Sequence, residues 1–170
     1  SDTWARVGCL IETPFAYPEL SVRENLHAAA LLHGLDRSRI DAAIDTVLGD
    51  FELARWEHKR ARALSLGNRQ RLGLASALVH QPAILVLDEP ANALDPAGVV
   101  FIRDMLRTAA GRGAAVLVSS HHLDQLARVA DRISMLHRGK VVGDLDPGGV
   151  DLERQFFDHV YRIDLARGAV

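Results

Sequence analysis

The sequence AILVLDEP occupies residues 83–90 of the chain. Its first five residues are apolar and mostly branched, and the run is bounded by Pro82 and an acidic pair. A continuous apolar run of this length is typical of a strand covered on both faces, as in a parallel sheet. Because α/β sheets bind ligands at the carboxyl ends of their strands, Asp88 is a candidate to face a bound metal ion and Glu89 to lie near an attacking water. The alternative is an acidic loop that simply follows a strand.

Helical patterns come before this strand. Ser21 and Glu24 have the S-x-x-E spacing of a capping box and open a mostly helical block without a heptad repeat. Either Asp36 or Ser38 is suited to cap the second helix of this block. The helical segments expected here cover residues 20–62 and 68–80.

Strand and helix patterns continue to alternate after the acidic pair. Asp95 and Pro96 suit the N-cap and N1 positions of a helix that reaches about residue 110. The remaining patterns predict a second buried strand, a short helix, a hairpin that turns at Arg138-Gly139 and a final helix, over residues 114–118, 123–130, 133–145 and 152–160. The alternation as a whole predicts an α/β fold with a mostly parallel sheet.

Composition excludes several classes of protein. The 170 residues are 48% hydrophobic and 25% charged, which is a globular mixture, and the net charge of −2 gives no electrostatic case for nucleic-acid binding. No apolar run approaches the ~18 residues that span a bilayer. The single cysteine, Cys9, cannot form an internal disulfide, so a reducing cytosol is the expected compartment.

Two polar segments elsewhere combine residue types that bind anions. Ser65, Gly67 and Asn68 lie where a helix begins, so a hydroxyl and backbone N–H groups meet the positive end of the helix dipole. A simple capped helix explains the same residues equally well. The second segment, Ser119-Ser120-His121-His122, follows the second strand. Adjacent residues at a strand end point in opposite directions, which argues against one metal bound by both histidines. A single buried or hydrogen-bonded histidine is the ordinary alternative.

Taken in order and with these gaps, the segments resemble the ATP-binding cassette (ABC) ATPases over essentially the whole chain. The similarity is to drug and bacteriocin-peptide exporters of the bacitracin-resistance type. The matching stretches are a core-to-helical-subdomain loop, the signature loop LSLGNRQR, the strand LVLDEP, the dimer-contact loop ALD and the switch SSH, at residues 7–26, 64–71, 85–90, 93–95 and 119–121.

The resemblance implies a role for each residue of the acidic pair and of the switch segment. Asp88 holds Mg²⁺, through water, and Glu89 polarises the water that attacks ATP. His121 contacts the γ-phosphate. Glu12 stands at a position usually held by Gln, which couples the nucleotide to the transmembrane partner. The added negative charge of Glu12 is tolerable mainly where it reaches Mg²⁺, so Glu12 is a second candidate metal ligand.

The signature and dimer-contact loops acquire roles across a dimer. Ser65, Gly67 and Asn68 bind the γ-phosphate of a nucleotide held by a second ATPase subunit, and Asp95 lies at the dimer seam. Two departures from the family pattern occur in this loop. Leu66 replaces the first of two glycines and brings a Cβ where the backbone must approach phosphate closely, and Asn68 replaces the usual Gln.

The resemblance also predicts how the chain is organised. We expect the C-terminal portion of a P-loop NTPase-like domain, with a helical subdomain over about 20–64, catalytic core elements over about 68–145 and a C-terminal helix and tail over 146–170. A phosphate-binding loop ends in Gly-Lys-Ser/Thr, whereas the one Gly-Lys here, Gly139-Lys140, is followed by Val141. We therefore expect the phosphate loop to lie in an N-terminal piece outside residues 1–170, and the fragment alone to be inactive.

The function expected is that of an ATP-hydrolysing subunit of an exporter of drugs or antimicrobial peptides. It would use ATP and Mg²⁺, pair with a second ATPase subunit, and bind a transmembrane permease at the cytoplasmic face of the cell membrane, without nucleic acid as a partner. The alternative is a truncated, non-catalytic cassette that binds or regulates a partner. A chromosome-maintenance or repair ATPase is disfavoured, because residues 20–62 lack the heptads of a coiled coil.

Overall fold

The computed structural model describes residues 3–11, 14–92, 94–123 and 127–166. The chain divides into two compact units, Ser1–Ser119 and Ser120–Val170, and each is described by itself. In order, the elements of the first unit are a 3-10 turn η1 (Trp4–Arg6), β1 (Val7–Leu10), α1 (Val22–Leu32), α2 (Arg37–Asp50), the 3-10 turns η2 (Ala54–Trp56) and η3 (Ala61–Ala63), α3 (Leu66–Leu78), β2 (Ile84–Asp88), α4 (Pro96–Gly111) and β3 (Ala115–Ser119).

The helical block begins as the sequence predicts. The Ser21 hydroxyl accepts a hydrogen bond from the Glu24 N–H at 3.2 Å, and the Ser21 N–H donates to the Glu24 carboxylate at 2.7 Å. Of the two candidate caps for α2, Asp36 is the one used, because its carboxylate accepts from the Ser38 N–H at 2.8 Å. Arg23 ties α1 to α2 and to the η2 region through ion pairs with Asp41, Asp45 and Glu57.

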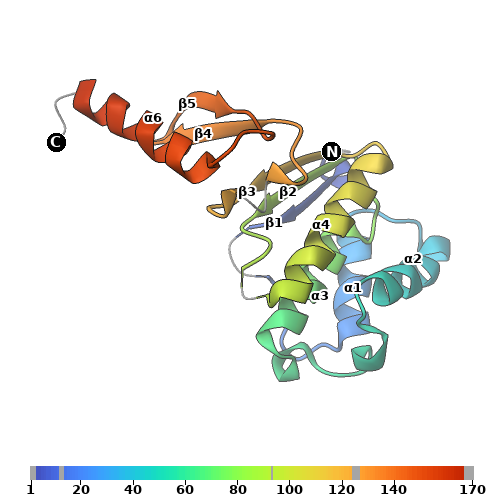
Figure 1. The fold of residues 1–170 in the computed structure, drawn as a ribbon. Helices are drawn as coiled ribbons and strands as arrows, with labels where there is room; N and C mark the ends of the chain where they lie inside the picture. Colours follow the sequence, from blue (N-terminus) through green and yellow to red (C-terminus); the bar gives the residue numbers. More distant parts are fainter. Residues whose placement is uncertain (1–2, 12–13, 93, 124–126, 167–170) are drawn as a thin grey trace. The chain divides into compact units, whose positions relative to one another are not determined.

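The three strands of the first unit form a parallel sheet in the order β1-β2-β3. Figure 1 shows them side by side, and α3 contacts β1 while α4 contacts β3. The predicted parallel α/β arrangement is therefore confirmed. Helix α3 lies so close to β1 that a Cβ on Gly8 would meet the Ala77 carbonyl oxygen at 2.0 Å, so only glycine fits there.

The expectation that the strands are covered on both faces is wrong for the described residues. One face is covered, because Leu85 and Leu87 are 0% and 1% exposed. Alternate residues in a strand point to opposite faces, and the other face carries Cys9, Ile84 and Leu117, all exposed, with Leu117 at 66%. The described helices α3 and α4 pack on the first face only, which leaves an apolar surface on the second.

The second unit contains a hairpin and one long helix among its described residues. Strands β4 (Ile133–His137) and β5 (Lys140–Leu145) are antiparallel and joined by Arg138 and Gly139, both with positive φ, the signature of a tight two-residue hairpin turn. The predicted hairpin is confirmed, and Gly139-Lys140 belongs to it. Helix α6 (Leu152–Ala166) extends beyond the predicted end at 160. The helix predicted over 123–130 includes residues 124–126, which lie outside the described residues.

The division of the chain into a helical subdomain, core and tail stays a prediction. Within the described residues, no helix combines the length and the apolar character needed to cross a membrane.

The core of the second unit is formed by four buried side chains: Ile133, Met135, Leu145 and Leu152.

Candidate functional site

The carboxyl edge of the parallel sheet holds the acidic pair. Asp88 is the last residue of β2 and lies in register with Ser119, the last residue of β3. The Ser119 hydroxyl donates a hydrogen bond to the Asp88 carboxylate. The Glu89 N–H donates to the Ser119 carbonyl oxygen at 3.1 Å and lies 3.3 Å from the Ser119 hydroxyl. The parallel pairing thus places two adjacent carboxylates and a serine hydroxyl at one point of the edge.

The backbone that follows this edge has a restricted geometry. Glu89 has a φ of +47°, in the left-handed region that favours glycine. Its carbonyl oxygen accepts from the Asn92 N–H at 3.1 Å. The next carbonyl, that of Pro90, accepts from the Gln70 amide at 2.9 Å. The turn that carries Glu89 is therefore fixed by a hydrogen bond that it donates to β3 and by hydrogen bonds that it accepts from its own downstream residues and from α3.

The signature loop is the amino end of α3. Helix α3 begins at Leu66, earlier than the predicted start at 68, because Ser65 is its N-cap. The Ser65 hydroxyl accepts from the Asn68 N–H at 3.3 Å, and its carbonyl accepts from the Arg69 N–H at 2.9 Å. The capped-helix interpretation is thus confirmed. It leaves room for the other interpretation, because a hydroxyl that accepts one hydrogen bond still carries an O–H donor for an anion.

Asp95 also acts as a helix cap. Its carboxylate accepts from the Gly98 N–H at 2.8 Å, and Pro96 occupies the first turn of α4, as the sequence predicts. A place for Asp95 at a dimer seam stays a prediction. Glu12 lies outside the described residues, so its proposed coupling and metal-binding roles also stay predictions.

The switch segment divides between the two units. Ser119 belongs to the first unit, whereas His121 belongs to the second, so the expected contact between His121 and the γ-phosphate remains a prediction. The rings of His121 and His122 lie 4.0 Å apart, centroid to centroid. The expectation that these side chains point apart is wrong, because β3 ends at Ser119 and the histidines lie in a bend, not in a strand. Among the described residues, no group of three or more histidines, cysteines or carboxylates is placed to hold a metal.

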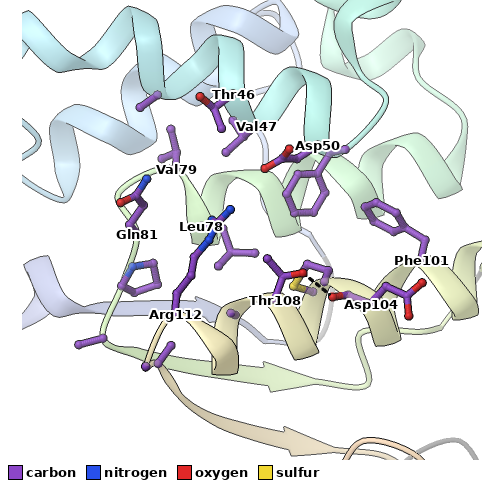
Figure 2. A pocket seen from close by; sticks show the side chains of 18 residues that line it. Thr46, Val47, Asp50, Leu78, Val79, Gln81, Phe101, Asp104, Thr108 and Arg112 are labelled. Atoms are coloured by element: carbon purple, nitrogen blue, oxygen red, sulfur yellow. Dashed lines mark hydrogen bonds between the residues drawn. The ribbon is translucent and has the colours of Figure 1, made fainter.

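A cavity of about 510 Å³ in the first unit lies away from this edge. Figure 2 shows it between α2, the end of α3 and α4, with Thr46, Asp104 and Arg112 among its polar residues. Ala83 and Ala114, which immediately precede β2 and β3, also line it. It therefore lies at the amino ends of the strands, whereas parallel α/β sheets bind ligands at the carboxyl ends.

Sequence reasoning missed two residues that the structure joins to the acidic pair. Ser119 lies in the switch segment but is not among the predicted site residues. Its position at the end of an apolar strand parallel to β2 was a usable signal. Gln70 carried no local signal, because a polar residue in a helix usually faces solvent. Gln70 is in fact only 4% exposed.

A parallel α/β sheet with an acidic pair at its carboxyl edge, combined with a serine-capped helix from a helical block, defines a nucleotide-binding α/β protein. The family model described as ABC transporter matches residues 1–92. The chain belongs to this family of ABC transporter ATP-binding proteins.

Known relatives agree with this assignment. The chain is 42% identical over 138 residues to the uncharacterized ABC transporter ATP-binding protein YhcH of Bacillus subtilis, covering 80% of this chain and 44% of that protein. It is 37% identical over 145 residues to the bacitracin transport ATP-binding protein BcrA of Enterococcus faecalis, covering 84% and 46%. The solved structure of an ATP binding subunit of an ABC transporter superimposes with a TM-score of 0.82 at 25% identity, covering 92% of this chain and 69% of that one. The chain spans about half the length of the first two relatives.

Proposed function

We propose that residues 1–170 are part of the ATP-hydrolysing subunit of an ABC exporter of drugs or antimicrobial peptides. The observation that carries the proposal is the acidic pair Asp88-Glu89, held by Ser119 at the carboxyl edge of the parallel sheet. The name of the bacitracin transport relative supports the class of exported compound. The activity belongs to the longer polypeptide, and we assign the phosphate-binding loop to its part outside residues 1–170.

The chemistry of the edge fits Mg²⁺, which prefers carboxylate and hydroxyl oxygens and keeps several waters. Asp88 would hold the ion, and Mg²⁺ would neutralise charge on the phosphates. Glu89 would orient a water molecule and accept its proton as the γ-phosphate leaves. The left-handed backbone fixes the point from which the Glu89 side chain extends, together with the hydrogen bond that the Glu89 N–H donates to Ser119 and the one that the Glu89 carbonyl accepts from Asn92.

The partners are a second ATPase subunit and a transmembrane permease. At the amino end of α3, the Ser65 hydroxyl, the first-turn N–H of Gly67 and the side-chain amide of Asn68 are suited to the γ-phosphate of a nucleotide held by the second subunit. Asp95 contributes to the seam between the two subunits. Glu12 and its loop couple the nucleotide to the permease, which holds the complex at the cytoplasmic face of the membrane.

The test is Glu89→Gln in the complete polypeptide, purified with and without its permease. The amide keeps the size of the side chain and removes its basicity, so ATP hydrolysis should fall by ~10²-fold or more while ATP binding changes little. A nucleotide-trapped dimer should accumulate on size-exclusion chromatography, and transport through the permease should stop.

The matched control is Asp41→Asn, which neutralises an exposed carboxylate paired with Arg23 in the helical block. This control should hydrolyse ATP at the wild-type rate. A Glu89→Gln protein that also turns over at that rate would refute the role of Glu89. A wild-type polypeptide that binds its partner without hydrolysing ATP would identify the non-catalytic cassette instead.

A further inference from the structure

We propose that Gln70 is a positioning residue, which holds the Glu89 turn and links it to the helix that begins at the signature loop. This inference rests on the proposed function. Gln70 lies on α3, and its amide nitrogen donates to the Pro90 carbonyl oxygen at 2.9 Å. Only Asn25 and Gln70 have buried polar side chains among the residues described, each 4% exposed.

The burial of Gln70 makes the loss of this hydrogen bond energetically costly. A buried amide that loses its partner costs free energy, because it has left water without compensation. The Pro90 carbonyl would carry the same free-energy cost without a partner, because Pro90 is also buried. Both groups are therefore satisfied together or not at all, which favours one arrangement of α3 against the turn.

The turn needs such support. Glu89 has a left-handed backbone, a conformation that is unfavourable for a residue other than glycine. The residue before a proline is further restricted, because the proline ring favours an extended conformation there. Pro90 itself has no N–H and cannot donate a hydrogen bond to fix its own position. Its carbonyl is thus the anchor that remains at residue 90, and Gln70 provides the donor.

The same contact links two parts of the proposed nucleotide machinery. Helix α3 begins at the Ser65 cap and reaches Gln70 within its second turn. A helix moves as a rigid element over this distance, so a displacement of the signature loop is transmitted to Pro90 and to the adjacent Glu89. Closure of the second subunit onto the loop would in this way adjust the carboxylate that activates water.

The experiment replaces Gln70 in the complete polypeptide by Leu and, in a second variant, by Glu. Leu removes the donor and leaves the Pro90 carbonyl unsatisfied, while Glu keeps the length of the side chain but presents a carboxylate to a carbonyl. A displacement of about 1 Å in a catalytic group can cost on the order of 10²-fold in rate. We expect kcat to fall by ~10-fold or more in both variants, with the KM for ATP changed by less than about threefold.

The matched control is Ile44→Ala. Ile44 is fully buried on α2, a different helix of the same unit, and belongs to no part of the proposed site. It should lower the melting temperature at least as much as Gln70→Leu but leave kcat within about twofold, once corrected for the folded fraction. Equal losses of kcat in the Gln70 and Ile44 variants would overturn the positioning role.

Amide hydrogen exchange provides a readout that does not need ATP hydrolysis. The Asn92 N–H is bonded to the Glu89 carbonyl, so its protection reports whether the turn is held. Protection at Asn92 should fall in both Gln70 variants and stay unchanged in Ile44→Ala. Unchanged protection in the Gln70 variants would overturn the inference even in an active enzyme, whereas a wild-type polypeptide without ATPase activity would overturn the proposed function alone.

Discussion

The first turn of helix α3 and the body of the helix differ in how far they are buried. At its amino end, Ser65 and Leu66 are exposed, Leu66 by 50%, and the cap is a single side-chain hydrogen bond. Two turns later Leu72 and Leu74 are fully buried, and α3 contacts β1, α1 and α2. The helix is therefore anchored by its body and presents its first turn to whatever binds there.

The comparison shows why the signature loop can be both exposed and well placed. A loop of this kind needs no hydrophobic contacts of its own, because the rest of the helix supplies them. Binding a phosphate at its first turn then costs little conformational entropy, since the amides are already aligned. The Glu89 turn is held differently, because its strained backbone donates a hydrogen bond to β3 and accepts one from α3.

The largest effect expected on this comparison is the contrast between two leucines of α3. Leu72→Ala empties a site that is 0% exposed and should lower the free energy of unfolding by about 2–5 kcal/mol. Leu66→Ala removes the same atoms at the half-exposed first turn and should change it by less than ~0.5 kcal/mol. Denaturant unfolding of both variants measures the difference. Similar losses would show that the first turn is buried in the protein.

The anchored body was largely predictable, and the reasons are local. A capping box at Ser21 and Glu24, a paired Asp95-Pro96 and a hairpin turn at Arg138-Gly139 are each signals within a few residues, and the structure contains all three. The parallel sheet followed from apolar runs separated by helical patterns. The carboxyl-edge position of Asp88 and Glu89 followed from the sheet.

What could not be predicted depends on contacts between distant residues. Gln70 is buried because a carbonyl 20 positions away faces it, and no pattern within α3 reveals that. The sequence also did not reveal that one face of the sheet is exposed, because an apolar strand has the same sequence pattern whether or not a second layer covers it. Leu117 shows this, being apolar and 66% exposed. The ring contact of His121 and His122 depended on where β3 ends.

A smaller effect is expected at the two serine caps. Ser65→Ala and Ser21→Ala each remove an N-cap hydroxyl, from α3 and α1, and each should cost about 1 kcal/mol of stability. Only Ser65 lies in the signature loop. ATP-dependent association of two complete polypeptides, followed by light scattering, should therefore weaken in Ser65→Ala and persist in Ser21→Ala. Loss of association in both variants would indicate that helix stability, not the Ser65 hydroxyl, matters.

The smallest effect concerns pH and the carboxyl end of α3. His80 follows this end, stacks on His33 with ring centroids 3.8 Å apart, and its Nε2 lies 3.3 Å from the Val7 carbonyl oxygen. Burial and, to a lesser degree, the His33 ring lower the pKa of His80 to about 4, although the hydrogen bond to Val7 raises it. Its Nδ1 is buried and has no partner among the described residues, so a proton there would gain no acceptor.

An unfolded chain protonates this histidine near its ordinary pKa of about 6.5. Because the folded pKa is the lower one, the unfolded state binds the proton first as the pH falls. Above about pH 7, His80 is neutral in both states, so it does not change the free energy of unfolding with pH. As the pH falls from about 6.5 to 4, its protonation in the unfolded state lowers the free energy of unfolding. His80→Gln removes this titration, so denaturant unfolding at pH 7.5, 6 and 5 should show a shallower decline in the variant. Parallel declines in the two proteins would mean that His80 titrates alike in the folded and unfolded chains, and that the anchored end of α3 does not depend on its neutral form.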